Sequence, residues 1–237
     1  MGSVFLLALR QATGRVRLLI MAVLASLPVL IALMAVNDER SMPVDEFEAF
    51  ALGGMLVGSI VPLVVLAIAS VAFGNEVEDR TLANLTLAPI PRWQIVVPKL
   101  LAAITIAAPF MVISAFVTSH VAFLADARAT AAVTVSTLVG VALYASAFVW
   151  LGLVTTQAIG FGLLYIVLWE GFFSGFVSGV RMLSIRHYTI AWMHGLDERR
   201  FAAADHLGFG VVTVTSVLVF GGFLWLSIRR LRRMDVP

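Results

Sequence analysis

The stretch "ATAAVTVSTLVGVALYASAFVWLGLVTTQAIGFGLLYIVLW", residues 129–169, contains no charged side chain over 41 consecutive positions. A helix that crosses about 30 Å of hydrocarbon needs roughly 20 apolar residues, so this run is long enough for two crossings. The polar residues and glycine of "TTQAIG", residues 155–160, favour a turn between them. The stretch therefore predicts a hairpin of two membrane-spanning helices.

The composition of the whole chain also points to a membrane. Hydrophobic residues make up 61% of the 237 residues and charged residues only 13%, and the mean hydropathy is +1.01. Such a chain cannot cover itself with a water-facing surface. The length suits one bundle, so we expect a single transmembrane domain over residues 1–237. Cysteine is absent, which excludes disulfides and thiolate chemistry, and the scattered arginines indicate lipid headgroups rather than nucleic acid as partners.

The other uncharged runs complete an all-α polytopic membrane protein with six transmembrane helices. Placing both termini in the cytoplasm puts ten of the 16 basic residues on that side, as the positive-inside rule favours. The basic "RRLRR" that follows the last run would stay there as well. The predicted spans are residues 18–36, 49–73, 100–124, 130–153, 158–180 and 207–228.

The N-terminus offers two further interpretations. Residues 3–17, "SVFLLALRQATGRVR", have the apolar and basic side chains of a short helix that lies along the membrane interface. The run at 18–36 is also preceded by arginines, as in a cleaved signal peptide. It is longer than the usual signal-peptide core of about 7–15 residues, so we favour a retained span.

The segment "GNEVEDRTLANLTLAPIPRWQIVVPK", residues 74–99, is the one long cytoplasmic loop of this topology. Asn75 and Glu78 have the spacing of a capping box, which predicts the start of a helix. Apolar side chains repeat along it and two prolines follow, so we expect an amphipathic helix from Asn75 to Ala88 whose apolar stripe fits a partner's groove. The alternative is a solvated connector in which Trp93 anchors at the interface.

Residues 76–103, "EVEDRTLANLTLAPIPRWQIVVPKLLAA", resemble the signature of type-2 ATP-binding-cassette (ABC-2) exporter permeases. The shared pattern is a Glu-rich start, a Thr-Leu pair, leucines, a proline, an arginine and a lysine that opens the next span. Arg80 and Pro98 stand where such permeases often have glycine. The matching positions are Glu76, Glu78, Thr81, Leu82, Leu85, Pro89, Arg92 and Lys99.

This resemblance implies a coupling helix that contacts a separate ABC ATPase (nucleotide-binding) subunit. It implies a dimer with a second copy or a homologous permease, and short outer re-entrant helices within residues 181–206. The implied setting is the inner (plasma) membrane of a bacterium. The expected ATPase-coupling residues are Glu76, Glu78, Asp79, Arg80, Thr81, Leu82, Leu85, Pro89 and Arg92.

The chain has no G-x-x-x-x-G-K-[ST] sequence, so we expect it to bind no cofactor, with ATP and Mg²⁺ on the partner subunit. We expect no catalytic group either, because no carboxylate pair or His-Glu helix motif is concentrated in the sequence. The four histidines lack metal-ligand spacing with a carboxylate, so no metal site is expected.

Glu170 is the one acid embedded in an apolar run, and an ionisable residue in a membrane span suggests a function. It would line a substrate path together with Phe172, Phe173 and Phe176. A structural role is the alternative: a rise of about 1.5 Å per residue from Thr156 puts Glu170 in the outer third of its span, within reach of water or a re-entrant backbone amide.

The predicted function is therefore the transmembrane permease subunit of an ATP-driven exporter. Two other functions fit the same spans. One is a secondary transporter that needs no ATPase, although we find no internal repeat of the kind such proteins show. The other is an ABC-type subunit that transmits ATP-driven motion to an outer partner.

Overall fold

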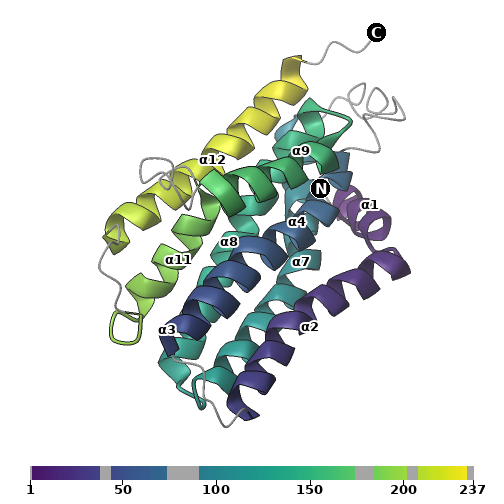
Figure 1. The fold of residues 1–237 in the computed structure, drawn as a ribbon. Helices are drawn as coiled ribbons and strands as arrows, with labels where there is room; N and C mark the ends of the chain where they lie inside the picture. The colour runs from purple at the N-terminus through teal and green to yellow at the C-terminus, as the bar shows by residue number, and fades with distance from the viewer. Residues whose placement is uncertain (1, 38–43, 74–90, 174–183, 202–207, 234–237) are drawn as a thin grey trace.

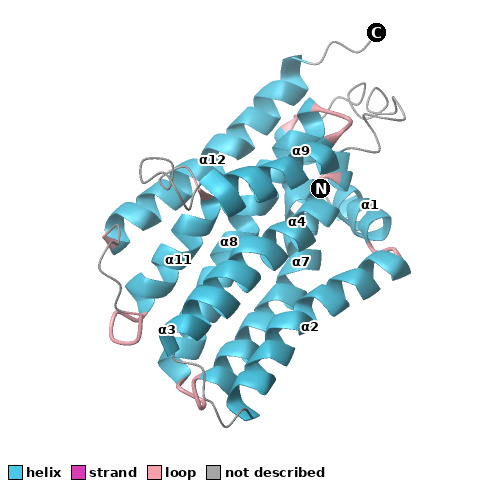
Figure 2. Cartoon of the chain, viewed as in Figure 1, coloured by secondary structure: helices cyan, strands magenta, loops and turns pink. Residues whose placement is uncertain are grey.

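The computed structural model describes residues 2–37, 44–73, 91–173, 184–201 and 208–233, and all secondary structure within these ranges is helical (Figures 1 and 2). Helix η1 and helix η2 have the wider π-type turn, which the bond from the backbone N–H of Val61 to the Leu56 carbonyl oxygen five residues back illustrates for η1. The elements are α1 (Gly2–Ala12), α2 (Arg15–Asn37), α3 (Val44–Phe47), η1 (Glu48–Ile60), α4 (Val61–Ala69), α7 (Trp93–Ala122), α8 (Ala127–Val154), α9 (Ala158–Leu164), η2 (Tyr165–Phe173), α11 (Ile185–Leu196) and α12 (Phe209–Arg233).

Within these ranges, five helices are long and apolar enough to cross a membrane: α2, the continuous η1–α4 helix from Glu48 to Phe73, α7, α8 and α12. They correspond to five of the six predicted spans. The predicted fifth span, 158–180, corresponds to a shorter apolar helix formed by α9 and η2, and its last residues lie outside the described ranges. The predicted turn is confirmed, since α8 ends at Val154 and the Gln157 N–H donates to Thr155 Oγ1 at 3.1 Å.

The start of α7 differs from the prediction. The loop was expected to continue to Lys99, but the helix already begins at Trp93. The charge of Lys99 interrupts the apolar pattern, which is why the sequence places the boundary there. In the structure the Lys99 side chain is only 2% exposed and lies inside the bundle, so its charge does not end the helix.

The bundle has two distinguishable ends. Helix α1, which packs on α7, and the last turn of α12 lie at one end, the upper end in Figure 1, which we call the terminal end. The opposite end, which we call the distal end, holds the start of η1, the turn between α7 and α8, and the end of α11. There His194 Nε2 of α11 lies 2.9 Å from Glu48 Oε1 of η1.

Helices α9, η2 and α11 together return the chain from the terminal to the distal end. Helix α8 arrives at the terminal end, α9 starts there, and α11 finishes at the distal end beside the start of α8 (Figure 1). Helix α11 occupies part of the segment predicted to hold outer re-entrant helices. It packs along α8, α12 and η1 within the bundle.

Helix α8 is the centre of the bundle because glycines let its neighbours approach closely. A Cβ atom on Gly152 would lie 2.7 Å from the Ser70 carbonyl oxygen at the end of α4. A Cβ atom on Gly140 would lie 2.8 Å from Thr189 Oγ1 of α11. These contacts fix α4 and α11 on two sides of α8.

Candidate functional sites

Most of the predicted ATPase-coupling residues lie outside the described residues, as does the predicted helix from Asn75 to Ala88. Arg92 is the exception: it is half-buried and immediately precedes α7, and its carbonyl oxygen accepts from the N–H groups of Ile95 and Val96. The residues of this set outside the described ranges are Glu76, Glu78, Asp79, Arg80, Thr81, Leu82, Leu85 and Pro89.

The two ends of this loop are joined by Lys99. Its Nζ atom donates to the Ala72 carbonyl oxygen at 2.5 Å and lies 4.2 Å from the centroid of the Phe73 ring. Ala72 and Phe73 are the last described residues before the loop, and Lys99 lies in the second turn of α7 after it. A buried ammonium group requires such partners because its desolvation is costly. The span before the loop is thus attached to the span after it at the point where the loop begins.

Glu170 is the second buried charge and is fully shielded from solvent. Its Oε1 atom accepts from the hydroxyl of Tyr165 at 2.7 Å and from that of Tyr144 in α8 at 3.2 Å. The same oxygen accepts from the backbone N–H groups of Ile185 at 3.0 Å and Arg186 at 3.4 Å. Oε2 accepts from the Ser184 hydroxyl. We call these five residues and Glu170 the carboxylate cluster.

The cluster forms where η2 meets the start of α11. The first N–H groups of a helix have no partner within the helix and carry a partial positive charge, so they favour a carboxylate. Ser184 is also the N-cap of α11, since its Oγ accepts from the His187 N–H at 3.2 Å. Glu170 therefore connects η2, which follows α9 from the terminal end, to α11, which continues to the distal end.

The cluster lies near the middle of the bundle. Tyr144 precedes the end of α8 by ten residues, about 15 Å along the helix axis. The side chain of Arg186 packs against η1, where a Cβ atom on Gly58 would lie 3.1 Å from Arg186 Nε. The structural alternative for Glu170 included a bond from a backbone amide, and two amides at the start of α11 donate to it.

Of the four residues of the predicted substrate path, the structure describes the side chains of Glu170 and Phe172. Glu170 is enclosed by its donors, whereas the neighbouring Phe172 is 56% exposed on the surface of η2. The Phe173 side chain and Phe176 lie outside what the structure describes. Two described cavities have other linings. One, of about 610 Å³, lies between α2, α4 and α9 near Arg15 and Arg17.

The second cavity, of about 420 Å³, lies between α8, α9, η2, α11 and α12. Six of its lining residues are aromatic, and we call it the aromatic cavity. They are Phe148, Trp150, Phe161, Tyr165, Tyr188 and Phe223.

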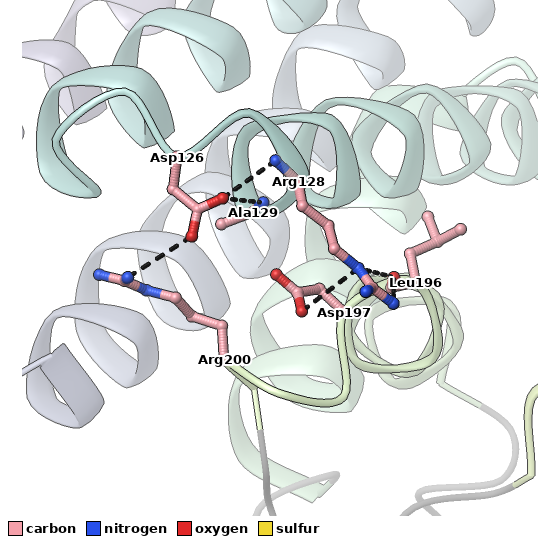
Figure 3. A network of polar contacts seen from close by, with 6 residues as sticks. All are labelled: Asp126, Arg128, Ala129, Leu196, Asp197 and Arg200. Carbon is pink, nitrogen blue, oxygen red and sulfur yellow. Dashed lines mark hydrogen bonds and ion pairs between the residues drawn. The ribbon is translucent and has the colours of Figure 1, made fainter.

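A polar network closes the distal end of the bundle (Figure 3). Asp126 caps α8 by accepting from the backbone N–H groups of Arg128 and Ala129, and its Oδ2 atom lies 3.6 Å from Arg200. Arg128 lies 3.6 Å from Asp197 and donates to the Leu196 carbonyl oxygen at 3.4 Å. These contacts fix the end of α11 to the start of α8.

The fold and its buried charges define an all-helical integral membrane protein with five candidate transmembrane helices in its described part. Residues 14–184 match the family described as ABC-2 family transporter protein, and because this is more than half of the chain, the protein belongs to that family. The resemblance seen in residues 76–103 is confirmed. The chain is thus an ABC-2 transporter membrane component, and in this family the ATPase sits on a separate subunit. A search of curated proteins finds no match.

The sequence identified Glu170 and Lys99 individually but not their partners. No local sequence pattern marks Tyr144 or Ser184 as a partner of Glu170. They contact Glu170 only because α8, η2 and α11 pack together. One available signal was the cap spacing from Ser184 to His187, which predicts a helix start within the outer segment.

Proposed function

We propose that this chain is the permease subunit of an ATP-driven ABC exporter, in which the predicted helix from Asn75 to Ala88 receives force from a separate ATPase. The docking surface would comprise Glu78, Arg80, Leu82 and Leu85. In this proposal the chain itself binds no cofactor, and ATP and Mg²⁺ bind to the partner subunit.

The observation that carries this proposal, beyond family membership, is the contact of Lys99 with Ala72 and Phe73. A force applied to a loop whose two ends moved separately would be absorbed by the loop. Because Lys99 attaches the end of the η1–α4 span to α7, a displacement of the loop moves both spans together. Helix α7 in turn packs on α1, α2 and α8, so the displacement reaches most of the bundle.

The topology supports the predicted number of spans. Helix α1 and the end of α12 lie at the same end of the bundle, which requires an even number of crossings (Figure 1). We infer that α9, η2 and α11 supply the crossing that the five long helices lack. The terminal end faces the cytoplasm of a bacterium, because the basic side chains of Arg229, Arg230, Arg232 and Arg233 gather at the end of α12. A dimer of two such permeases completes the transporter.

The test is to purify the tagged chain mildly from native membranes and to look for a co-purifying ATPase. Leu82→Asp puts a charge on the proposed docking surface and should abolish co-purification. Leu124→Asp is the matched control, because Leu124 is 84% exposed in the turn between α7 and α8 at the distal end. Both variants are first checked for an unchanged elution profile in detergent.

Loss of the ATPase from Leu82→Asp alone supports the proposal. Retention of the ATPase by both variants would exclude this surface as the docking site. If no ATPase accompanies the wild-type chain while a known ABC complex survives the same extraction, the secondary-transporter function takes precedence.

A further inference from the structure

The aromatic cavity is enclosed by side chains from five elements and contains little polar surface. The rings of Trp150 of α8 and Phe223 of α12 have centroids 5.6 Å apart and planes tilted by 50°. Phe148 and Tyr165 meet edge to face at 6.4 Å. A volume of about 420 Å³ lies within the range of roughly 300–1,000 Å³ typical of sites for drug-sized ligands.

The electrostatic character of this cavity favours a positive charge. Aromatic faces carry a negative potential that attracts cations. The Tyr165 hydroxyl donates to a carboxyl oxygen of Glu170 at 2.7 Å, and a donated hydrogen bond polarises a phenol toward greater negative charge on the ring. Tyr144, which stacks on Phe148 at 5.8 Å, donates to the same oxygen. Glu170 thus acts on two neighbouring rings from outside the cavity.

Within the described ranges, no cation–π contact involves the rings of Trp150, Phe223 or Tyr165. None of the described lining residues is charged. The cation–π contacts recorded within the described ranges involve Phe73, Phe123 and Trp225, none of which lines the cavity. The Arg186 side chain points toward Gly58 of η1 rather than into the cavity.

A ligand would reach the cavity from the hydrocarbon phase. Phe161 is 53% exposed at its edge, and α12, which forms one wall, is largely exposed along its length. Only a molecule that partitions into the membrane would arrive by this route.

We propose that the aromatic cavity is a binding site for a lipophilic organic cation, one whose charge is surrounded by apolar groups. The bound cation contacts the Trp150, Phe223 and Tyr165 rings. An anionic molecule of the same shape is disfavoured by the same rings. This inference concerns binding by the permease chain alone and does not depend on its coupling to an ATPase.

The experiment uses a pair of ions with the same shape and opposite charge. Full-length chain is placed in nanodiscs of zwitterionic phospholipid, and saturable binding of tetraphenylphosphonium and tetraphenylborate is measured by equilibrium dialysis against empty nanodiscs. We expect saturable binding of the cation and at least tenfold weaker binding of the anion.

Variants locate the site. Trp150→Leu and Phe223→Leu remove a ring but keep an apolar side chain, and each should weaken cation binding by about 2- to 30-fold, the range that cation–π contacts span. Trp225→Leu is the matched control, because Trp225 lies on α12 outside the cavity and is 56% exposed. It should leave binding unchanged. Two independent cavity variants keep the test decisive if one of them fails to fold.

Three results would overturn the proposal. The first is the absence of saturable cation binding or equal binding of both ions. The second is unchanged binding in the folded cavity variants. The third is displacement of the cation by dodecanol at equal concentration, which would assign the cavity to a neutral acyl chain.

Discussion

Replacing Glu170 should separate η2 from α11. In Glu170→Leu, five donors lose their acceptor at once. The hydroxyls of Tyr144, Tyr165 and Ser184 can rotate toward other acceptors, but the backbone N–H groups of Ile185 and Arg186 cannot. An unsatisfied buried donor costs about 1–3 kcal/mol, so the two amides alone predict a loss of about 2–6 kcal/mol.

Glu170→Gln is the matched variant because its carbonyl oxygen can keep the bonds that Oε1 accepts. It loses the charge and presents an NH₂ group to Ser184, so we expect a smaller loss, about 1–3 kcal/mol. For a chain of this size, about 1 kcal/mol shifts the midpoint of thermal unfolding by roughly 2–4 °C. The leucine variant should therefore unfold on the order of 10 °C below the wild type in the same detergent, with the glutamine variant in between.

A disulfide reports the position of α11 directly. The chain has no cysteine, so a single introduced pair can form only one intramolecular bond. A Cβ atom on Gly140 would lie 3.5 Å from the Cβ atom of Thr189, at the short end of the range of about 3.5–4.5 Å found in disulfides. The pair Gly140→Cys and Thr189→Cys should oxidise readily, as measured by loss of maleimide labelling. Adding Glu170→Leu should slow this reaction several-fold, and adding Glu170→Gln should slow it less.

The predicted role of Glu170 is refuted if Glu170→Leu unfolds at the wild-type temperature and the cysteine pair oxidises at an unchanged rate. The bonds of Glu170 would then contribute nothing to the position of α11. A drop in unfolding temperature with unchanged oxidation would also contradict it, because the destabilisation would not arise at the contact between α8 and α11.

Other changes test the remaining contacts. Lys99→Met removes the ammonium group, which should lower the free energy of unfolding by about 1.5–3 kcal/mol. We expect trypsin to cleave faster within residues 74–92. Export should fall, while the ATPase should still co-purify with the chain. Gly152→Leu forces a side chain against a carbonyl at the end of α4 and should lower the unfolding temperature, whereas Gly160→Leu, which has open space around it, should not. Asp126→Ala removes the cap of α8 and the ion pair with Arg200, so we expect a loss of about 0.5–2 kcal/mol in thermal unfolding.

The lengths of the apolar runs were sufficient to predict most of the bundle. Residues 129–169 had to fold back because they exceed one crossing, and the turn lies at Thr155 as predicted. Helices α2 and α12 extend beyond the predicted spans at 18–36 and 207–228, through flanking arginines whose long side chains can reach water. Run length reports how much chain lies in hydrocarbon, and this property does not depend on tertiary contacts.

The return of the chain through α9, η2 and α11 was not predictable in the same way. Residues 158–180 read as one continuous apolar span, and nothing in that pattern places the start of α11 at Ser184 near the middle of the bundle. That position depends on Glu170 meeting the α11 amides, on Tyr144 from another helix, and on the space that Gly140 leaves for Thr189. Such contacts join residues 14 to 49 positions apart, beyond the reach of local patterns.

Lys99 and Glu170 follow one physical rule. Each is a charged residue within an apolar run, and each bonds to backbone groups near a helix end of opposite polarity; for Glu170 three side-chain hydroxyls also donate. The Lys99 ammonium meets a carbonyl oxygen near the C-terminal end of the η1–α4 span, and the Glu170 carboxylate meets the amides at the N-terminus of α11. The helix dipole favours both placements, and both satisfy terminal N–H or C=O groups that have no partner within their helix.

This rule changes where a substrate should be sought. An isolated charge in a membrane span suggests a transport site, but both charges here are already satisfied by the protein and connect consecutive helices. Their removal should therefore alter stability and coupling before it alters ligand binding. The aromatic cavity has the opposite properties: its described lining is uncharged, and it opens toward lipid at Phe161. Variants of Trp150 and Phe223 should change ligand affinity with little effect on assembly, which separates the binding site from the framework that moves it.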